Sequence, residues 1–202
     1  MNVQPKIRRP VIASADDLNV AAKRYRWPMI CDPFCRFTYH GHEELLALWR
    51  SLPSEGGIPY RRDMTARLLR PYLNSVAIYE RVENSNGEVR YRVRLMGSRI
   101  VQVFGELTGK FLDEAVPEDY VARWHALPDV TLGTGGPVRL LIRSDTFNKA
   151  HMVAEYLCVP LRADDGAAKL VLYAGHYEGL RSWAEVEAEE RERLGLEPLG
   201  IL

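Results

Sequence analysis

Residues 89–110 read VRYRVRLMGSRIVQVFGELTGK, and no other segment restricts the fold as strongly. The first half alternates strictly between arginines and apolar residues, and the apolar positions are Tyr91, Val93 and Leu95. A period of two predicts a β-strand that buries one face and exposes the other to water. At Gly97 the alternation stops, and apolar residues continue at helical spacing as far as Phe104. The stretch therefore predicts a strand that leads through a glycine into short helices.

The segments around this strand predict an antiparallel sheet. Residues 75–81 have the pattern of a strand, and the turn sequence Asn84-Ser85-Asn86-Gly87 separates them from the strand at 89–96. Asn and Gly at such a turn favour a hairpin between the two strands. Three later segments also have strand character, at residues 138–143, 151–161 and 169–175. The sequence thus indicates an α+β protein with about five antiparallel strands.

The late strands are apolar on both faces. Leu140 and Leu141 are neighbours in sequence, as are Leu157 and Cys158. A sheet with a single buried face would alternate apolar with polar residues. We therefore expect the second face to be covered by a helix at residues 42–52, by a C-terminal helix or by another subunit.

Three helices are indicated by the spacing of apolar and charged residues. Residues 42–52 carry an apolar stripe made of Leu45, Leu48, Trp49 and Leu52, which favours a helix packed on the sheet. A longer helix begins at Pro117 and should end at Pro128, because proline interrupts a helix interior. Residues 181–194 predict a charged C-terminal helix with Glu–Arg pairs four residues apart.

Residues 1–40 show no sustained period, and their prolines are Pro5, Pro10, Pro28 and Pro33. We interpret them as an N-terminal arm that is partly extended. Its apolar residues should pack on another surface, and they are Trp27, Met29, Ile30, Phe34 and Phe37. The predicted division of the chain is therefore the arm at 1–40, the sheet domain at 41–178, and a C-terminal helix and tail at 179–202.

In this order, the segments resemble the PAS domain. More closely, they resemble a bacterial PAS subfamily of small, often stand-alone proteins, formerly catalogued as a domain of unknown function. The resemblance extends from Leu45 to Tyr177. Besides the segments above, it rests on Gly57-Ile58-Pro59-Tyr60-Arg61-Arg62-Asp63, Pro71-Tyr72-Leu73, Glu106-Leu107-Thr108-Gly109-Lys110 and Val159-Pro160-Leu161. The sequence departs from the family at Met64-Thr65-Ala66, where the family has an aromatic residue and an Asp-Pro pair.

The resemblance implies a PAS-like fold, in which a sheet of about five antiparallel strands is flanked by short helices, with a leading helix before it and a C-terminal helix after it. It also implies a sensory or signal-relay function that acts through a small apolar ligand, through protein contacts, or through both. No catalytic residue and no output domain are expected. The effect would then pass through a regulatory protein partner.

A PAS-like cup would be lined by the inward face of the sheet and by the central helices, as small-molecule pockets commonly are. The candidate ligand-binding residues are Tyr91, Val93, Phe104, Phe111, Trp124, Leu140, Ile142 and Tyr156. The alternative is that these side chains fill the core completely and leave no cavity. The sequence does not identify the ligand.

Two motifs raise the question of a cofactor, which the sequence leaves unknown. His125 lies on the helix that supplies the axial histidine in haem-binding PAS sensors, but it is rotated about 100° from Trp124. We therefore expect a half-buried or solvated His125 rather than a haem ligand. Phe34-Cys35-Arg36-Phe37 is similar to the Asn-Cys-Arg-Phe core of flavin photosensors, but it lacks the asparagine and precedes the domain. We expect no flavin bond at Cys35.

Composition restricts the partners and the compartment. The 202 residues hold 27 Lys and Arg against 27 Asp and Glu, so no overall field favours nucleic acid or an anionic membrane. No apolar run reaches the length of about 18 residues that a membrane-spanning helix needs. Three cysteines agree with a reducing cytoplasm and no disulfide framework. No spacing of histidines, cysteines or carboxylates predicts a metal site.

Two other functions stay open. A small enzyme or ligand carrier on a cone-shaped α+β fold would place acids on inward strand positions, and Glu155 is the one obvious strand acid. A non-sensing scaffold would use the PAS fold only to dimerise. We expect a homodimer held by the arm and the outer sheet face; the alternative is a monomer whose arm folds across its own sheet.

Overall fold

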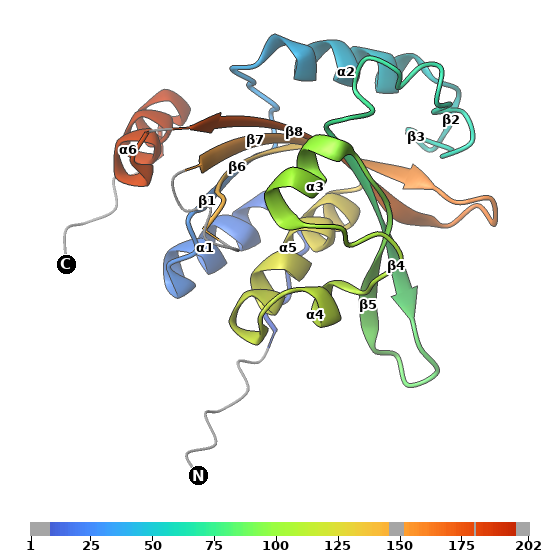
Figure 1. The fold of residues 1–202 in the computed structure, drawn as a ribbon, viewed down its shortest axis with the longest axis horizontal. Helices are drawn as coiled ribbons and strands as arrows, with labels where there is room; N and C mark the ends of the chain where they lie inside the picture. Colours follow the sequence, from blue (N-terminus) through green and yellow to red (C-terminus); the bar gives the residue numbers. More distant parts are fainter. Residues whose placement is uncertain (1–8, 146–151, 180, 197–202) are drawn as a thin grey trace.

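The computed structural model describes residues 9–145, 152–179 and 181–196. Its centre is a six-stranded antiparallel sheet in the order β1-β6-β7-β8-β4-β5 (Figure 1). The strands of this sheet are β1 (Met29–Asp32), β4 (Val76–Glu83), β5 (Val89–Met96), β6 (Val138–Arg143), β7 (Met152–Arg162) and β8 (Ala168–Gly179). A separate pair is formed by β2 (Ser54–Glu55) and β3 (Ile58–Pro59). The predicted α+β class with an antiparallel sheet is therefore confirmed, with one strand more than expected.

β4 and β5 form the predicted hairpin, and β5 spans the expected residues. Asn84 shapes the turn, because its side-chain oxygen accepts hydrogen bonds from the backbone N–H groups of Asn86 and Glu88, each at 3.0 Å. Gly87 has a φ of 76°, a conformation that glycine adopts without steric cost. These local contacts explain why the hairpin could be read from the sequence.

One face of the sheet packs against a layer of helices (Figure 1). The helices of this inner layer are α1 (Ala15–Tyr25), α3 (Ser98–Phe104), α4 (Leu112–Ala115) and α5 (Glu118–Thr134). Every second residue of a central strand points into it, so Ala154, Tyr156 and Cys158 of β7 are all buried there. Trp124 and Val130 of α5 meet them from the other side. The main hydrophobic core lies between these two surfaces.

The opposite face of the sheet is covered by two further helices of the same chain, α2 (His40–Ser51) and α6 (Trp183–Leu194). Leu45 and Trp49 of α2 are buried in a second apolar cluster with residues of β4, β7 and β8. Val186 of α6 packs against Leu141 and Val153. The expectation that the second face needs a cover is thus confirmed, and α2 and α6 supply it.

The described part of the N-terminal arm differs from the extended segment that its prolines predict. It contains α1 and β1, and Pro10, Pro28 and Pro33 lie outside both elements. Ser14 caps α1, since its hydroxyl accepts a hydrogen bond from the backbone N–H of Asp17 at 3.1 Å. The prolines therefore mark where elements begin and end, not where structure is absent.

β1 adds the sixth strand to the sheet, because it pairs with β6 and places Met29 opposite Ile142. The side chain of Asn19 shields part of this new edge. It accepts a hydrogen bond from the backbone N–H of Cys31 at 2.8 Å and donates one to the carbonyl oxygen of the same residue at 2.9 Å. An edge strand whose backbone is already bonded is a poor template for another strand. Residues 1–8 of the predicted arm lie outside the described residues.

α5 does not end at Pro128, as the sequence predicts, but continues to Thr134. Pro128 has no backbone N–H to donate, which costs the helix a hydrogen bond. Val130 and Thr131 beyond it are fully buried, and the Thr131 hydroxyl donates to the carbonyl of Leu127 at 3.1 Å. The free energy gained by burying the last turns of α5 exceeds the cost of the hydrogen bond that Pro128 cannot make. Neither α5, at 17 residues, nor any other described helix is long and apolar enough to cross a membrane.

β8 is longer than the predicted strand at 169–175, because its pairing with β7 continues to Gly179. Gly179 lies opposite Met152, and Tyr177 lies opposite Ala154. The strand is expected to end at Gly175, but this glycine instead lies within β8, at a position of close packing. A Cβ there would lie 2.9 Å from the ring of Tyr156.

Trp49 is predicted to anchor α2 on the sheet. Its side chain is buried, and its indole N–H donates to the carbonyl of Pro160 at 3.1 Å. Trp49→Ala should lower the free energy of unfolding by about 3–5 kcal/mol, because it opens a cavity and leaves that carbonyl without its donor. Chemical denaturation measures this loss. The exposed Arg50→Ala on the same helix should change it by less than about 0.5 kcal/mol, and a loss below about 1 kcal/mol for Trp49→Ala would mean that α2 is peripheral.

Candidate functional site

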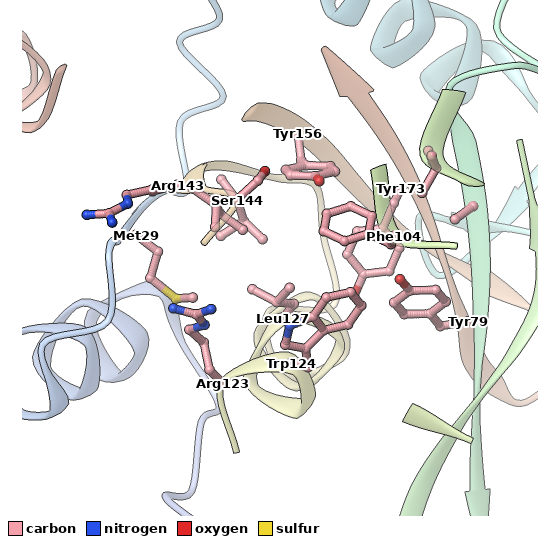
Figure 2. Close-up of a pocket in the computed structure, with 14 residues that line it drawn as sticks. Met29, Tyr79, Phe104, Arg123, Trp124, Leu127, Arg143, Ser144, Tyr156 and Tyr173 are labelled. Carbon is pink, nitrogen blue, oxygen red and sulfur yellow. The ribbon is translucent and has the colours of Figure 1, made fainter. Parts of the chain in front are cut away.

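The inner layer encloses a cavity of about 50 Å³ between the sheet and helices α3 and α5 (Figure 2). Five of the eight predicted pocket residues line it, and they are Phe104, Trp124, Leu140, Ile142 and Tyr156. The other lining residues, which the sequence patterns did not predict, include Met29, Tyr79, Arg123, Ser144 and Tyr173. The alternating pattern of β8 could have indicated Tyr173, because it points to the same face as the buried Val171.

Aromatic rings form most of the wall of this cavity. The rings of Phe104 and Trp124 meet edge to face, with centroids 5.1 Å apart. Tyr79 and Tyr173 lie on neighbouring strands with ring centroids 4.6 Å apart. Such contacts add to the stability of a packed core. They also give the cavity the surface that a planar or apolar guest would contact.

Two buried hydroxyl groups of the cavity lining have no hydrogen-bond partner among the described residues. They are the hydroxyls of Ser144 and Tyr173, whose residues are each 4% exposed. Burial raises the pKa of Tyr173 well above its ordinary value, so its hydroxyl stays protonated. By contrast, the hydroxyl of Tyr156 donates to that of Tyr177 at 3.0 Å. The cavity therefore offers two unused polar groups, and it has room for about three to five water-sized atoms.

An ion pair stands at one end of the cavity. Arg123 of α5 is buried, and its guanidinium donates to the carboxylate of Asp145, with one contact at 3.1 Å. Arg143 also belongs to the lining, and Figure 2 shows its guanidinium pointing away from the other lining residues. Its Nε is buried and has no hydrogen-bond partner in the part of the chain that the structure describes. This end is thus charged, while the opposite end is aromatic.

The three remaining predicted residues lie outside the cavity lining. Tyr91 and Val93 are buried on β5, and the Tyr91 hydroxyl donates to Asp129 of α5. Phe111 lies beneath the guanidinium of Arg90, with the ring centroid 3.9 Å from its Cζ. β5 is the edge strand of the sheet, so its inward residues meet α4 and α5 instead of the central cavity.

His125 is fully buried, so the expectation of a half-buried or solvated side chain is wrong. Its ring meets the ring of Tyr91 edge to face at 5.4 Å, and it does not line the cavity. Both ring nitrogens are buried without a partner among the described residues. Burial, together with the positive charge of Arg9, lowers the pKa of His125 to about 4. The ring is enclosed because Tyr91 packs against the side of α5 that the apolar spacing predicts to be exposed to water.

Cys35 packs on the outer face of the sheet with the cluster beneath α2, away from the cavity. Burial raises the pKa of its thiol to about 12, so the thiol stays protonated. Among the described residues, no group of three or more histidines, cysteines or carboxylates is placed to hold a metal ion.

Glu155, the strand acid that an enzymatic function would need, faces the outer layer and is fully used there. Its carboxylate accepts hydrogen bonds from the backbone N–H groups of Thr38 and Tyr39, both at 2.9 Å, and from Nε of Arg139 at 2.6 Å. Nδ1 of His42 lies 3.3 Å from the same carboxylate. Burial alone would raise its pKa, but these hydrogen bonds and the charge of Arg139 hold the pKa well below its ordinary value. Glu155 is a structural anchor on the face opposite the cavity.

The ionised Glu155 carboxylate should make a contribution to stability that depends on pH. Glu155→Gln should lower the free energy of unfolding at neutral pH by about 3–5 kcal/mol, because Arg139 loses a buried counter-charge. A depressed pKa stabilises the fold above the unfolded value of about 4.3 and stops doing so as the pH falls below it. The gap between wild type and variant, measured by urea denaturation, should therefore shrink from about pH 7 to about pH 3. Glu192→Gln, an exposed change on α6, serves as control; a gap that stays constant with pH would contradict the assignment.

A sequence profile described as the PAS domain matches residues 37–175. One similar solved structure is an RNA-binding Light-Oxygen-Voltage receptor, at 13% identity and a TM-score of 0.40, covering 73% of this chain and 43% of that chain. Another is VqmA of Vibrio cholera in a complex with ligand and DNA, at 14% identity and a TM-score of 0.38, covering 68% and 62%.

A third similar structure is the light state of the Aureochrome1 LOV domain, a blue-light photoreceptor. It is 11% identical, with a TM-score of 0.33, and the match covers 62% of this chain and 97% of that chain. The chain spans less than half the length of the RNA-binding receptor. No curated protein matches it.

Proposed function

The chain belongs to the PAS domain family, and from that premise we propose that it is a sensory domain whose signal is a small molecule bound in the aromatic cavity. In this proposal it has no catalytic role. The bound state is passed on through contact with a regulatory protein partner. Its three free cysteines fit a cytoplasmic setting, which is part of the proposal.

The two unpartnered hydroxyls carry this proposal. Buried polar groups in folded proteins are nearly always hydrogen-bonded, and each one left unpaired costs about 1–3 kcal/mol. The Ser144 and Tyr173 hydroxyls line the same small, otherwise aromatic space. A ligand with a polar atom at either position would satisfy that hydroxyl and be held in one orientation. A core that served packing alone would gain from alanine and phenylalanine at these positions.

The position of the cavity supports relay to a partner. Met29 of β1 and Ser144 after β6 line it, so a guest would contact the strands that join the N-terminal segment to the sheet. The same β6 carries Arg139, which holds α6 on the outer face. A shift of β6 on ligand binding would therefore reach a helix that a partner can contact.

Native mass spectrometry of protein purified without refolding tests the sensory proposal. We expect a species heavier than the 23.1 kDa chain that loses a small molecule on activation. The double variant Ser144→Ala/Tyr173→Phe should lose this species. It should also unfold at higher denaturant concentration than the ligand-free wild type, because two unpaired polar groups are gone.

A non-sensing scaffold is the alternative, and the small volume of the cavity favours it. Wild type with no bound molecule, together with a double variant of unchanged stability, would indicate the scaffold and contradict the sensor.

A homodimer is also part of the proposal, although the arm in this chain lies on its own sheet. The support is exposed apolar surface on the N-terminal segment, where Val20 is 68% and Phe34 is 77% exposed. Sedimentation at high micromolar concentration should show a dimer that Phe34→Ser weakens, because association follows mass action. Arg24→Ser, at another exposed position of the segment, is the control. A single 23.1 kDa species throughout would exclude the dimer.

A further inference from the structure

The charged end of the cavity adjoins a larger groove of about 570 Å³, within the size range of small-molecule sites. The groove lies between the end of α1 and helix α6, where Trp27 and Trp183 contribute to its walls. Met29 and Arg143 line both the groove and the cavity. The two hollows are therefore adjacent.

The ion pair of Arg123 and Asp145 spans the boundary between the two hollows. Arg123 belongs to the lining of the cavity, and Asp145 belongs to the lining of the groove. The side chain of Arg123 is 7% exposed, whereas that of Asp145 is 21% exposed. A guest that enters from the groove must pass this pair. The charge of the guest then decides whether the Arg123–Asp145 pair attracts or repels the guest.

The boundary carries an excess of positive charge. Across both linings, the acidic side chains are Asp145 and Glu187, and the basic ones are Lys23, Arg26, Arg123, Arg143 and Arg191. Glu187 is already paired with Arg191 at 3.2 Å. At the boundary itself, the linings contain two guanidinium groups, those of Arg123 and Arg143, and one carboxylate, that of Asp145. A guanidinium stays protonated under all physiological conditions, so this excess does not titrate away.

We propose that the molecule bound in the cavity is a small organic anion, a monocarboxylate with a short apolar tail, an inference that rests on the proposed sensory function. The carboxylate lies at the boundary, where it contacts Arg123 and Arg143 and supplies a partner for the buried Nε of Arg143 and for the hydroxyl of Ser144, the residue between Arg143 and Asp145. A planar carboxylate matches the guanidinium fork. A single negative charge balances the excess of one positive charge, which a dianion such as phosphate would exceed.

The tail of this anion lies among the aromatic rings. The cavity of about 50 Å³ has room for about three to five atoms of the size of a water molecule. An apolar tail of that length gains from leaving water. A longer tail would have to displace Phe104 or Trp124, which pack edge to face. The cavity thus limits the length of the tail, while the boundary selects its charge.

Isothermal titration calorimetry with butyrate, and with butyramide as its uncharged equivalent, tests the inference. Butyrate should bind the wild type at least about tenfold more tightly than butyramide. Acetate and octanoate should both bind more weakly than butyrate, because one tail leaves the cavity unfilled and the other exceeds it. Raising the ionic strength should weaken butyrate binding only.

Asp145→Asn is the decisive variant, provided that circular dichroism shows it to be folded, because the substitution removes the counter-charge of the buried Arg123. Asp145 competes with the ligand for Arg123 and repels it, so removing its charge should tighten butyrate binding by about tenfold and leave butyramide unchanged. Arg143→Gln should weaken butyrate binding by a similar factor. Glu187→Gln removes an acidic charge from the groove away from the boundary, and it should change the affinity by less than about threefold.

Arg123→Gln would leave Asp145 unpaired and could unfold the protein, so the pair is tested as Arg123→Gln/Asp145→Asn. This double variant should fold, as judged by circular dichroism, and should bind butyrate no better than butyramide. Equal affinity for the two probes in the wild type, or no butyrate binding up to about 10 mM, overturns the inference. So does an Asp145→Asn variant that binds butyrate no more tightly. A bound molecule in native mass spectrometry would still leave the sensory proposal standing in these cases.

Discussion

The central strands of the sheet are buried on both faces, and this constraint positions every layer around them. In β7, each residue from Val153 to Leu161 is buried. Successive side chains of a strand point to opposite sides, so Tyr156 and Leu157 need separate covers. The inner cover comes from α5, and the outer cover comes from α2 and α6. Helices from different parts of the chain therefore pack on the same sheet. The fold is the arrangement in which the inner and the outer face of the sheet are covered at the same time.

The outer cover also depends on one buried cation. Arg139 of β6 donates to Glu155 on the neighbouring strand and to Glu190 of α6. Glu155 in turn holds the backbone at Thr38 and Tyr39, where the chain turns into α2. A guanidinium without these carboxylates would be very costly at 1% exposure. The two helices of the outer layer are thus tied to the side chain of Arg139, α6 directly through Glu190 and α2 through Glu155, which holds the backbone before α2.

On the inner side, α5 presents three different surfaces through three consecutive residues. Each step along a helix turns by about 100°. Trp124 therefore lies in the aromatic wall of the cavity, Arg123 reaches its charged end, and His125 faces Tyr91 on the edge strand. One turn of helix combines packing, charge and an enclosed neutral imidazole. Movement of α5 would therefore affect all three surfaces together.

The sequence by itself determined the features that depend on neighbouring residues. The alternation at 89–96, the Asn84 turn and the apolar stripe of α2 are local patterns, and each became the element that it predicts. The PAS-like class followed from their order. Five of the eight pocket residues were also found, because periodicity shows which face of an element is buried. Periodicity does not show what lies opposite that face.

Only the tertiary structure decided the rest. Met29 reaches the cavity because β1 pairs with a strand more than 100 positions away, and no local pattern in a proline-rich arm encodes that pairing. α5 continues past Pro128 because its last turns are buried against other elements. Arg123 and Asp145 meet across the chain at the end of the cavity. In each case the deciding free energy comes from contacts between distant segments, which form only when the whole sheet and its two covers assemble.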